Sequence, residues 1–196
     1  MKFSPGEQFD YYDGGYILLG LVIESISGLS FSEFVQKNVI DPAEMQDSGY
    51  FATDQLPERT AYAYIQNADG SWRTNFFAVP IIGAPDGGAY TTAPDMHRFW
   101  KALIGNILLK ADLTELLLSS QITTSLEAPH SQYGFGVWID QPDESVRKFF
   151  VEGYDPGVSF RSCVYDNEDK LLTVIGNTAE ALWPLYAQLE EFLGLN

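Results

Sequence analysis

Few side chains in this sequence could act as nucleophiles or metal ligands. The one cysteine, Cys163, lies in the run Phe160 to Tyr165, whose apolar and aromatic residues indicate a strand. We expect that thiol to be buried and inert, because a catalytic cysteine needs a base beside it. The two histidines, His97 and His130, stand far apart and no second cysteine accompanies them, so the sequence predicts no metal site.

Four other segments combine glycine, proline and tyrosine at regular gaps. They are Phe3-Ser4-Pro5-Gly6 with Tyr11-Tyr12-Asp13 and Gly15-Tyr16-Ile17-Leu18-Leu19-Gly20, then Val39 to Met45, Gly87 to Met96, and Tyr133-Gly134-Phe135-Gly136 with Gly153 to Gly157. In order and spacing they resemble the family of class C β-lactamases, DD-peptidases and related esterases. The family patterns are F-x-P-G, Y-S-N, G-Y-x-L-L-G, I-x-x-P-L-G-M, G-G-L-x-S-T-A-x-D-L, Y-G-x-G and G-x-x-P-G.

The resemblance implies acyl transfer through a serine ester. In the family, an S-x-x-K pair supplies the nucleophile, the tyrosine of Y-x-N relays protons, and a K-T-G or H-x-G strand supplies positive charge or a hydrogen bond. No S-x-x-K pair lies upstream of Tyr11, where the family has it, so we expect the missing part to be N-terminal. The complete enzyme would hydrolyse β-lactams, D-Ala-D-Ala peptides or small esters, and the resemblance implies no cofactor.

The motifs that remain depart from the family pattern. Tyr11 stands at the tyrosine of Y-x-N, and Asp13 replaces the asparagine, so that an amide becomes an acceptor-only anion. Val151-Glu152-Gly153 occupies the third motif, where valine replaces the usual lysine or histidine. Tyr11 and Asp13 are therefore the candidate catalytic pair, and Val151-Glu152-Gly153 is the candidate substrate-binding strand, both in degenerate form. Lys148 is a nearby residue that could replace the lost cation in space.

Each candidate also has a structural interpretation. Without cations to lower the pKa of its hydroxyl, Tyr11 is expected to keep the family's position without working as a base. Asp13 is expected to favour an Asp-Gly bend with Gly14. Gly153 and Gly157 are expected to serve backbone conformation at a strand start, with an oxyanion or substrate-edge role as the second interpretation.

The elements that position these residues follow from periodicity and turn residues. Helices are expected at 15–27, 30–39, 92–104, 112–120 and 179–193, with a hairpin around the turn Asn67 to Gly70. Strands are expected at 133–140, 148–151, 159–165 and 171–175, with a turn at 166–169. Residues 1–125 are thus mainly helical and 126–196 mainly strands. This predicts one partial domain of the α+β class, a β-lactamase/transpeptidase-like antiparallel sheet covered by helices, N-terminally incomplete.

Composition excludes some partners. The formal charge is −16 and the eleven basic residues form no stripe, so we expect neither nucleic acid nor an anionic membrane as partner. No apolar run is long enough to span a bilayer. The run Met1 to Gly6 lacks the apolar core of a signal peptide, so the chain as written is expected in the cytoplasm, although family members are often exported.

Two functions remain open at this stage. The chain is the C-terminal part of a serine hydrolase that is inactive in isolation, or a degenerate homologue that binds a partner without catalysis. The strand at 171–175 is expected to be an unpaired edge, which favours self-association or binding of a complementing segment. The alternative is that the loop Phe51 to Pro85 folds over that edge and leaves a monomer.

Overall fold

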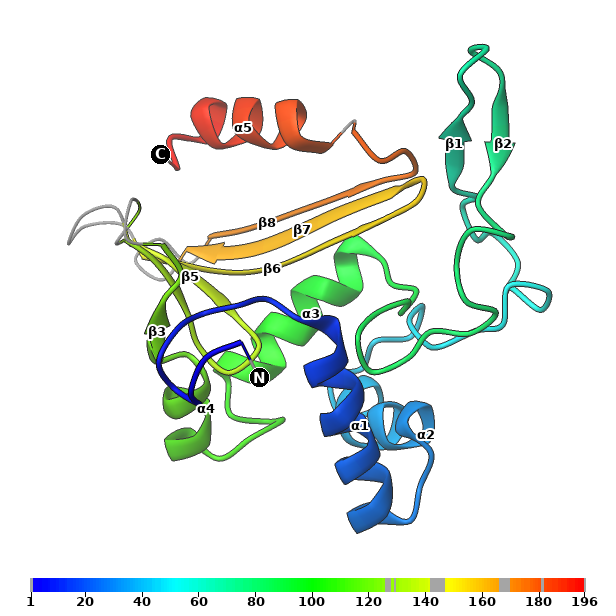
Figure 1. Cartoon of the computed structure of the whole chain (residues 1–196). Helices are drawn as coiled ribbons and strands as arrows, with labels where there is room; N and C mark the ends of the chain where they lie inside the picture. Colours follow the sequence, from blue (N-terminus) through cyan, green and yellow to red (C-terminus); the bar gives the residue numbers. More distant parts are fainter. Residues whose placement is uncertain are drawn as a thin grey trace.

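An antiparallel sheet of six strands organises the chain, with helices on both of its faces (Figure 1). The computed structural model describes residues 2–125, 128, 130–141, 147–165, 170–180 and 182–195. The helices are α1 (Asp13–Ser27), α2 (Phe31–Val35), the π-helical turn η1 (Gln36–Ile40), α3 (Ala93–Ile104), α4 (Ala111–Leu117) and α5 (Leu182–Leu193). The expected α+β class is confirmed.

The sheet follows the order of the chain. Its strands are β3 (Ile122–Thr123), β4 (Ser131–Tyr133), β5 (Trp138–Asp140), β6 (Lys148–Asp155), β7 (Val158–Tyr165) and β8 (Lys170–Gly176), each antiparallel to the next. A separate hairpin of β1 (Tyr64–Gln66) and β2 (Trp72–Thr74) projects from one end of the molecule (Figure 1). Within the described residues, β8 pairs with β7 on one side only, which makes it an edge strand, as expected.

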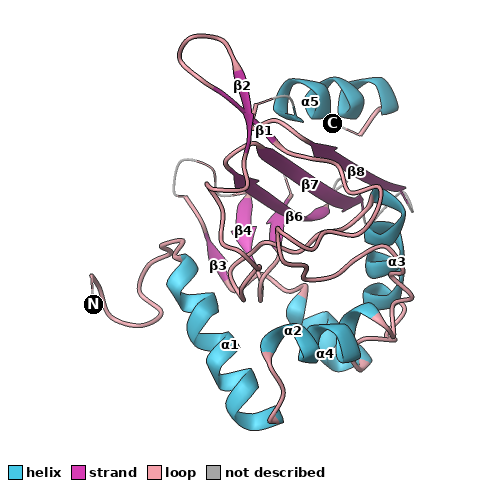
Figure 2. Cartoon of the chain, turned by 90° about the vertical axis from the view of Figure 1, so that its right-hand side faces the viewer, coloured by secondary structure: helices cyan, strands magenta, loops and turns pink. Residues whose placement is uncertain are grey.

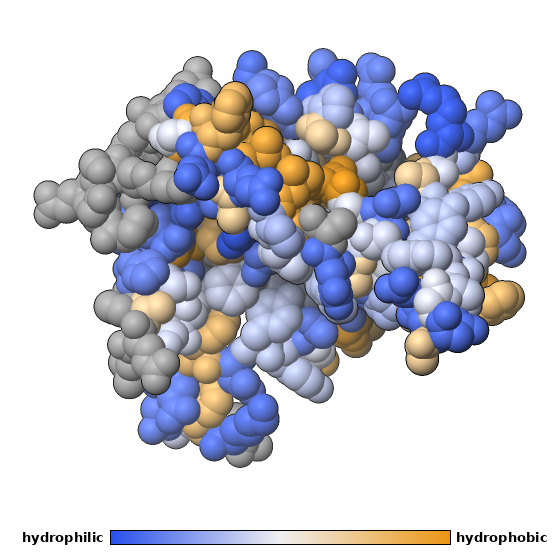
Figure 3. All heavy atoms as spheres, turned by 90° about the horizontal axis from the view of Figure 1, so that it is seen from above, coloured by the Kyte–Doolittle hydropathy of each residue, from blue (hydrophilic) through white to orange (hydrophobic). Residues whose placement is uncertain are grey.

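Alternation along β6 and β7 builds two apolar layers. Phe149 and Val164 pair across the strands and pack with the fully buried Trp100 of α3. Phe150 and Cys163, one residue along, face the opposite way and pack with Tyr186 of α5. Because successive side chains of a strand point to opposite faces, α3 covers one side of the sheet and α5 the other. Figure 1 shows this sandwich from the side, and Figure 3 shows the molecule from above, with hydrophobic residues among the hydrophilic ones on that face.

The helix ends follow the expected chemistry. Gly28 ends α1 in the left-handed conformation, with φ 71°, and its N–H bonds the carbonyl of Glu24. Ser30 and Glu33 form a complete capping box at the start of α2. Thr92 accepts a hydrogen bond from the backbone N–H of Asp95 and so caps α3.

Asp95 then connects α3 to a distant loop. Its carboxylate is fully buried and accepts hydrogen bonds from the backbone N–H of Asp47 at 2.8 Å and the hydroxyl of Ser48 at 2.7 Å. The guanidinium of Arg98 binds the other carboxylate oxygen at 2.5 Å. Asp95, which belongs to the segment Gly87 to Met96, therefore joins two parts of the fold. A buried carboxylate is tolerated only when it is paired and hydrogen-bonded.

The expected single strand at 133–140 is wrong. The structure has two short strands, β4 and β5, joined by a turn in which Gly136 adopts φ 87°. A Cβ on Gly134 would lie 2.5 Å from the carbonyl oxygen of Leu117, so that turn also packs too closely for a side chain. The two glycines of Y-G-x-G therefore make a bend where the alternating pattern favoured a continuous strand. The expected turn at 166–169 lies outside the described residues.

Candidate functional site

Tyr11 lies in the extended segment that leads into α1. Its ring stacks on Trp138 of β5, with 6.1 Å between ring centroids and 18° between planes, and about half of the residue remains exposed. Asp13 is the first residue of α1. The expected Asp-Gly bend at Asp13 is therefore wrong, since a carboxylate in the first helical turn is favoured by the positive end of the helix dipole.

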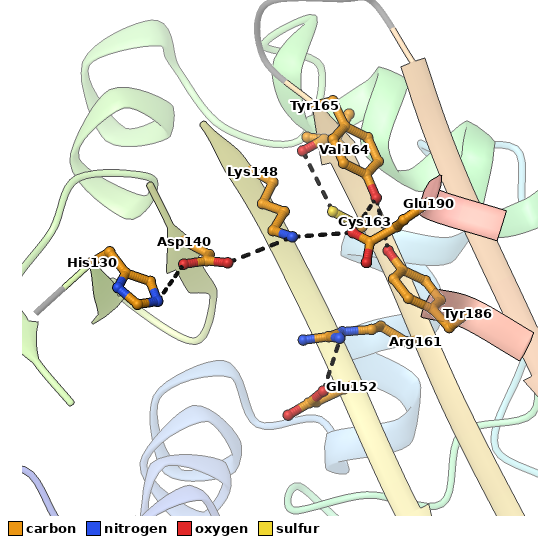
Figure 4. A network of polar contacts seen from close by, with 10 residues as sticks. All are labelled: His130, Asp140, Lys148, Glu152, Arg161, Cys163, Val164, Tyr165, Tyr186 and Glu190. Carbon is orange, nitrogen blue, oxygen red and sulfur yellow. Dashed lines mark hydrogen bonds and ion pairs between the residues drawn. The ribbon is translucent and has the colours of Figure 1, made fainter. Parts of the chain in front are cut away.

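The third-motif residues occupy the centre of β6 and face alternate ways. Val151 is half-buried and packs against the layer that α3 forms with the sheet. Glu152 points to the α5 side, where its carboxylate lies 3.3 Å from the Nε of Arg161 on β7 (Figure 4). Gly153 pairs with Phe160, and a Cβ at Gly153 would only reach ordinary contact distance from that ring.

Lys148 does not replace the missing cation at Val151. The two residues are three apart on one strand and so face opposite sides of the sheet. The Nζ of Lys148 lies 3.1 Å from the carboxylate of Glu190 on α5 and 3.5 Å from that of Asp140 on β5 (Figure 4). Its charge is used to hold α5 against the sheet.

One S-x-x-K string does occur in the chain, from Ser145 to Lys148. It lies downstream of Tyr11, whereas the family places its pair upstream. Ser145 lies outside the described residues, and Lys148 is committed to Glu190 and Asp140. The segment Ser145 to Lys148 therefore has the residue types of the S-x-x-K motif, but it does not have the position in the chain that the family's chemistry requires.

The electrostatic environment of Tyr11 is anionic. Partial burial raises the pKa of its hydroxyl, and the charge of Asp13, the neighbouring Tyr16, a hydrogen bond with Asp13 and the charge of Glu152 raise the pKa further. The charges of Asp13 and Glu152 thus both act on the hydroxyl of Tyr11. A hydroxyl with a raised pKa stays protonated at neutral pH, which is the opposite of what a proton-accepting tyrosine needs.

A second group of carboxylates lies at the end of β6. Burial raises the pKa of Asp155, and the charges of Asp86 and Asp13 raise it further. The β6–β7 turn, the loop that carries Asp86 and the start of α1 therefore converge at this end of the sheet. The turn is fixed by Gly157, with φ 82°, because a Cβ there would lie 3.0 Å from the backbone of Tyr64.

Several of these neighbours were not predicted from the sequence. Trp138 stacks against the ring of Tyr11, the charge of Asp86 raises the pKa of Asp155, and Arg161 lies 3.3 Å from the carboxylate of Glu152. The only sequence signal was the pairing implied by consecutive strands, which places Arg161 opposite Glu152. The thiol of Cys163 is buried and its pKa is raised to about 11, as burial of a thiolate requires. Among the described residues, no group of three or more acidic, histidine or cysteine side chains could hold a metal ion.

The six-stranded antiparallel sheet with helices on both faces is the fold of the serine β-lactamase and penicillin-binding class. The profile of the Beta-lactamase family matches residues 1–180, and the chain belongs to that family. Solved structures support the same fold. The penicillin-binding protein from Bacillus halodurans is 45% identical with a TM-score of 0.93, over 98% of this chain and 59% of that one.

Two further relatives extend the comparison. Penicillin-binding protein 4* of Bacillus subtilis is 27% identical over 91% of this chain and 42% of its own length. An octameric penicillin-binding protein homologue from Pyrococcus abyssi is 26% identical with a TM-score of 0.84, over 99% of this chain and 44% of that one. This chain thus spans about half the length of the relatives it matches, and an oligomer is known within the fold.

Proposed function

We propose that this chain is the C-terminal part of a serine hydrolase that cleaves amide or ester bonds through an acyl-enzyme. Tyr11 and Val151-Glu152-Gly153 supply its Y-x-N and third-motif positions. The substrate would be a β-lactam, a D-Ala-D-Ala peptide or a small ester. No cofactor is needed for this chemistry, because the nucleophile and proton relays are all side chains.

We further propose that these 196 residues do not turn over substrate by themselves. The observation that carries this is the surroundings of Tyr11. Asp13 and Glu152 add to the burial that raises the pKa of its hydroxyl, and valine stands where the family has a cation. A protonated tyrosine cannot accept a proton from a serine, and the ten given residues before Tyr11 contain no S-x-x-K pair that could supply that serine.

The second candidate is a binding module without catalysis, and one observation favours it. Val151 contacts the apolar layer between α3 and the sheet. A lysine or histidine at this position would carry its charge into those contacts, which costs free energy unless a partner is supplied. The packing thus accommodates the valine, as expected for a chain whose third motif is no longer under catalytic demand.

Intact-mass spectrometry with a penicillin tests the first proposal. We expect no covalent adduct on the isolated chain and no hydrolysis of an activated ester above buffer. A polypeptide from the part of the Bacillus halodurans relative that lies outside its match to this chain is then added. Partial acylation that increases when Asp13→Asn and Val151→His are introduced supports the hydrolase. Absence of any adduct in every combination supports the binding module instead, and an adduct on the isolated chain contradicts the proposed inactivity.

A further inference from the structure

The start of α1, which follows Tyr11 directly, has no side-chain cap. Tyr12, the residue before the helix, makes no capping hydrogen bond, whereas Ser30 and Thr92 cap the starts of α2 and α3. Figure 2 shows that the N-terminal end of α1 lies nearest the sheet and that the rest of the helix extends away from it. The placement of Tyr11 against the sheet therefore depends on contacts other than a helix cap.

Tyr16 supplies such a contact in the first turn of the helix. Its hydroxyl lies 2.5 Å from the hydroxyl of Tyr133 on β4, and the pair is partly buried. The same hydroxyl also lies beside the turn after β4, since a Cβ on Gly136 would stand 3.7 Å from it. A hydrogen bond between two hydroxyls depends on both distance and angle, so this pair fixes how α1 meets the β4–β5 hairpin.

Aromatic contacts connect the same hairpin back to Tyr11. Tyr133 pairs with Trp138 across β4 and β5, and their rings meet edge to face with 4.9 Å between centroids. Trp138 in turn stacks on Tyr11. Phe9 contacts both hairpin rings, with centroid distances of 5.6 Å to Tyr133 and 5.7 Å to Trp138. These rings form a closed set of contacts, which the chain between Tyr11 and Tyr16 completes.

Within this closed set, the hydrogen bond is the contact that selects one arrangement. Aromatic pairs are favourable over a wide range of centroid distances, from about 4.5 to 7 Å. A pair of hydroxyls is satisfied only between about 2.5 and 3.0 Å. Without the bond, the start of α1 can shift against the hairpin while the rings stay in contact with one another, and Tyr11 then loses its fixed place on Trp138.

We propose that Tyr16 and Tyr133 are positioning residues for Tyr11. Their hydrogen bond fixes the start of α1 on the β4–β5 hairpin and thereby holds the ring of Tyr11 on Trp138. Both residues act through the placement of Tyr11, and neither is assigned a contact with substrate. This inference rests on the proposed function, because the placement of Tyr11 matters for catalysis only in a hydrolase.

Acetylation of tyrosine hydroxyls with N-acetylimidazole, measured residue by residue by peptide mass spectrometry, reports the placement of Tyr11 in the isolated chain. Tyr133→Phe keeps the ring contacts and removes the hydrogen bond. We expect it to increase the acetylation rate of Tyr11 at least about threefold, because the phenolate reacts and its fraction follows the pKa. Partial burial is the largest cause of the raised pKa of Tyr11, so release from Trp138 increases both exposure and reactivity.

Tyr16→Phe is the second variant and breaks the same bond. It should increase the rate at Tyr11 at least as much as Tyr133→Phe, because the charge of Tyr16 itself also raises the pKa of Tyr11. The double variant should react no faster than Tyr16→Phe alone, since two changes to one bond are not additive. Rates that multiply in the double variant overturn the shared role.

Tyr186→Phe is the matched control, because it removes a hydroxyl from another pair, 3.2 Å from Tyr165 on the α5 side of the sheet. It should leave the rate at Tyr11 unchanged. Tyr154, which is 63% exposed on β6, is the internal standard and should react equally in every variant. Circular dichroism checks that each variant folds. An unchanged rate at Tyr11 in the folded Phe variants overturns the positioning role, and so does an equal increase at all tyrosines, which reports general loosening.

The unsubstituted chain provides a test that needs no variant. Tyr16 and Tyr133 should be acetylated more slowly than Tyr154, because their hydroxyls are partly buried and bonded to each other. Equal rates at the three residues overturn the proposal. The assay also needs no turnover, which separates it from the test of the hydrolase. A faster Tyr11 without a penicillin adduct in any combination keeps the positioning role and contradicts the hydrolase, whereas an adduct with an unchanged Tyr11 rate contradicts the positioning role alone.

Discussion

The ion pairs that hold α5 against the sheet provide a quantitative test of the structure. Lys148 lies between the carboxylates of Glu190 and Asp140, and Glu190 also accepts a 2.7 Å hydrogen bond from the hydroxyl of Tyr165 (Figure 4). The side chains of Lys148 and Glu190 are only 17% and 11% exposed. Removing either partner should destabilise the chain, but by different amounts.

The difference follows from what each substitution leaves unpaired. Lys148→Met leaves two carboxylates, Glu190 and Asp140, without their shared cation, and Asp140 then retains the contact of its Oδ1 with the Nε2 of His130 at 3.6 Å. We expect the free energy of unfolding to fall by about 3 kcal/mol, the low end for breaking a buried pair because these groups are partly exposed. Glu190→Gln keeps the Tyr165 bond and leaves Lys148 beside Asp140, so we expect a loss of about 1 kcal/mol.

Urea unfolding of both variants and of the double variant measures these losses. The double variant should be more stable than the sum of the single losses predicts, by about 1 kcal/mol, because the two groups act on each other. Hydrogen exchange of the α5 amides locates the effect, since α5 should open first when its anchor is removed. Equal losses in the two single variants, or a loss below about 0.5 kcal/mol for Lys148→Met, would refute the shared-cation geometry.

Three further predictions concern other parts of the chain. The raised pKa of Asp155 means that the folded state holds this proton more tightly than the unfolded state. Ionised Asp155 therefore destabilises the fold above its raised pKa, and Asp155→Asn should increase the urea midpoint at pH 7 but not below pH 3.8, the ordinary value. Gly157→Ala should cost about 1–2 kcal/mol more than Gly70→Ala, since both have positive φ but only Gly157 meets the backbone of Tyr64; equal thermal midpoints would contradict this. The isolated chain should self-associate through the β8 edge, more strongly at high salt because the net charge is screened, and Ile175→Lys should reduce this in light scattering over a dilution series. A monomer at all concentrations and salts would contradict the edge prediction.

The sequence predicted the elements best where local chemistry decides them. The glycine after α1 and the capping box before α2 gave correct boundaries, because both act within four residues. The class and the sheet-with-helices arrangement were also correct, since the succession of periodic segments limits the layers that can form. The single strand predicted at 133–140 was wrong because the alternation of apolar and polar side chains continues on both sides of the glycine turn. The pattern alone therefore did not show that the strand is interrupted there.

The site was less predictable because it depends on pairing between distant strands. Motif order predicted that Tyr11 and Glu152 belong to one site, and the charge of Glu152 contributes to the raised pKa of Tyr11. Motif order could not show that Lys148 faces away from Val151. That orientation follows only once both residues are known to lie on β6, where residues three apart face opposite sides of the sheet. Nor could it show that Asp13 begins a helix, since an Asp-Gly pair suits both a turn and a first helical turn.

The buried Asp95 has a consequence for how proteins of this kind are recognised. Its carboxylate holds Asp47, Ser48 and Arg98 together, far along the chain from the Y-x-N tyrosine. The surrounding segment Gly87 to Met96 is therefore required for the fold. A sequence search with that motif therefore finds chains that have this fold whether or not they can form an acyl-enzyme. Its matches include inactive homologues as well as active enzymes.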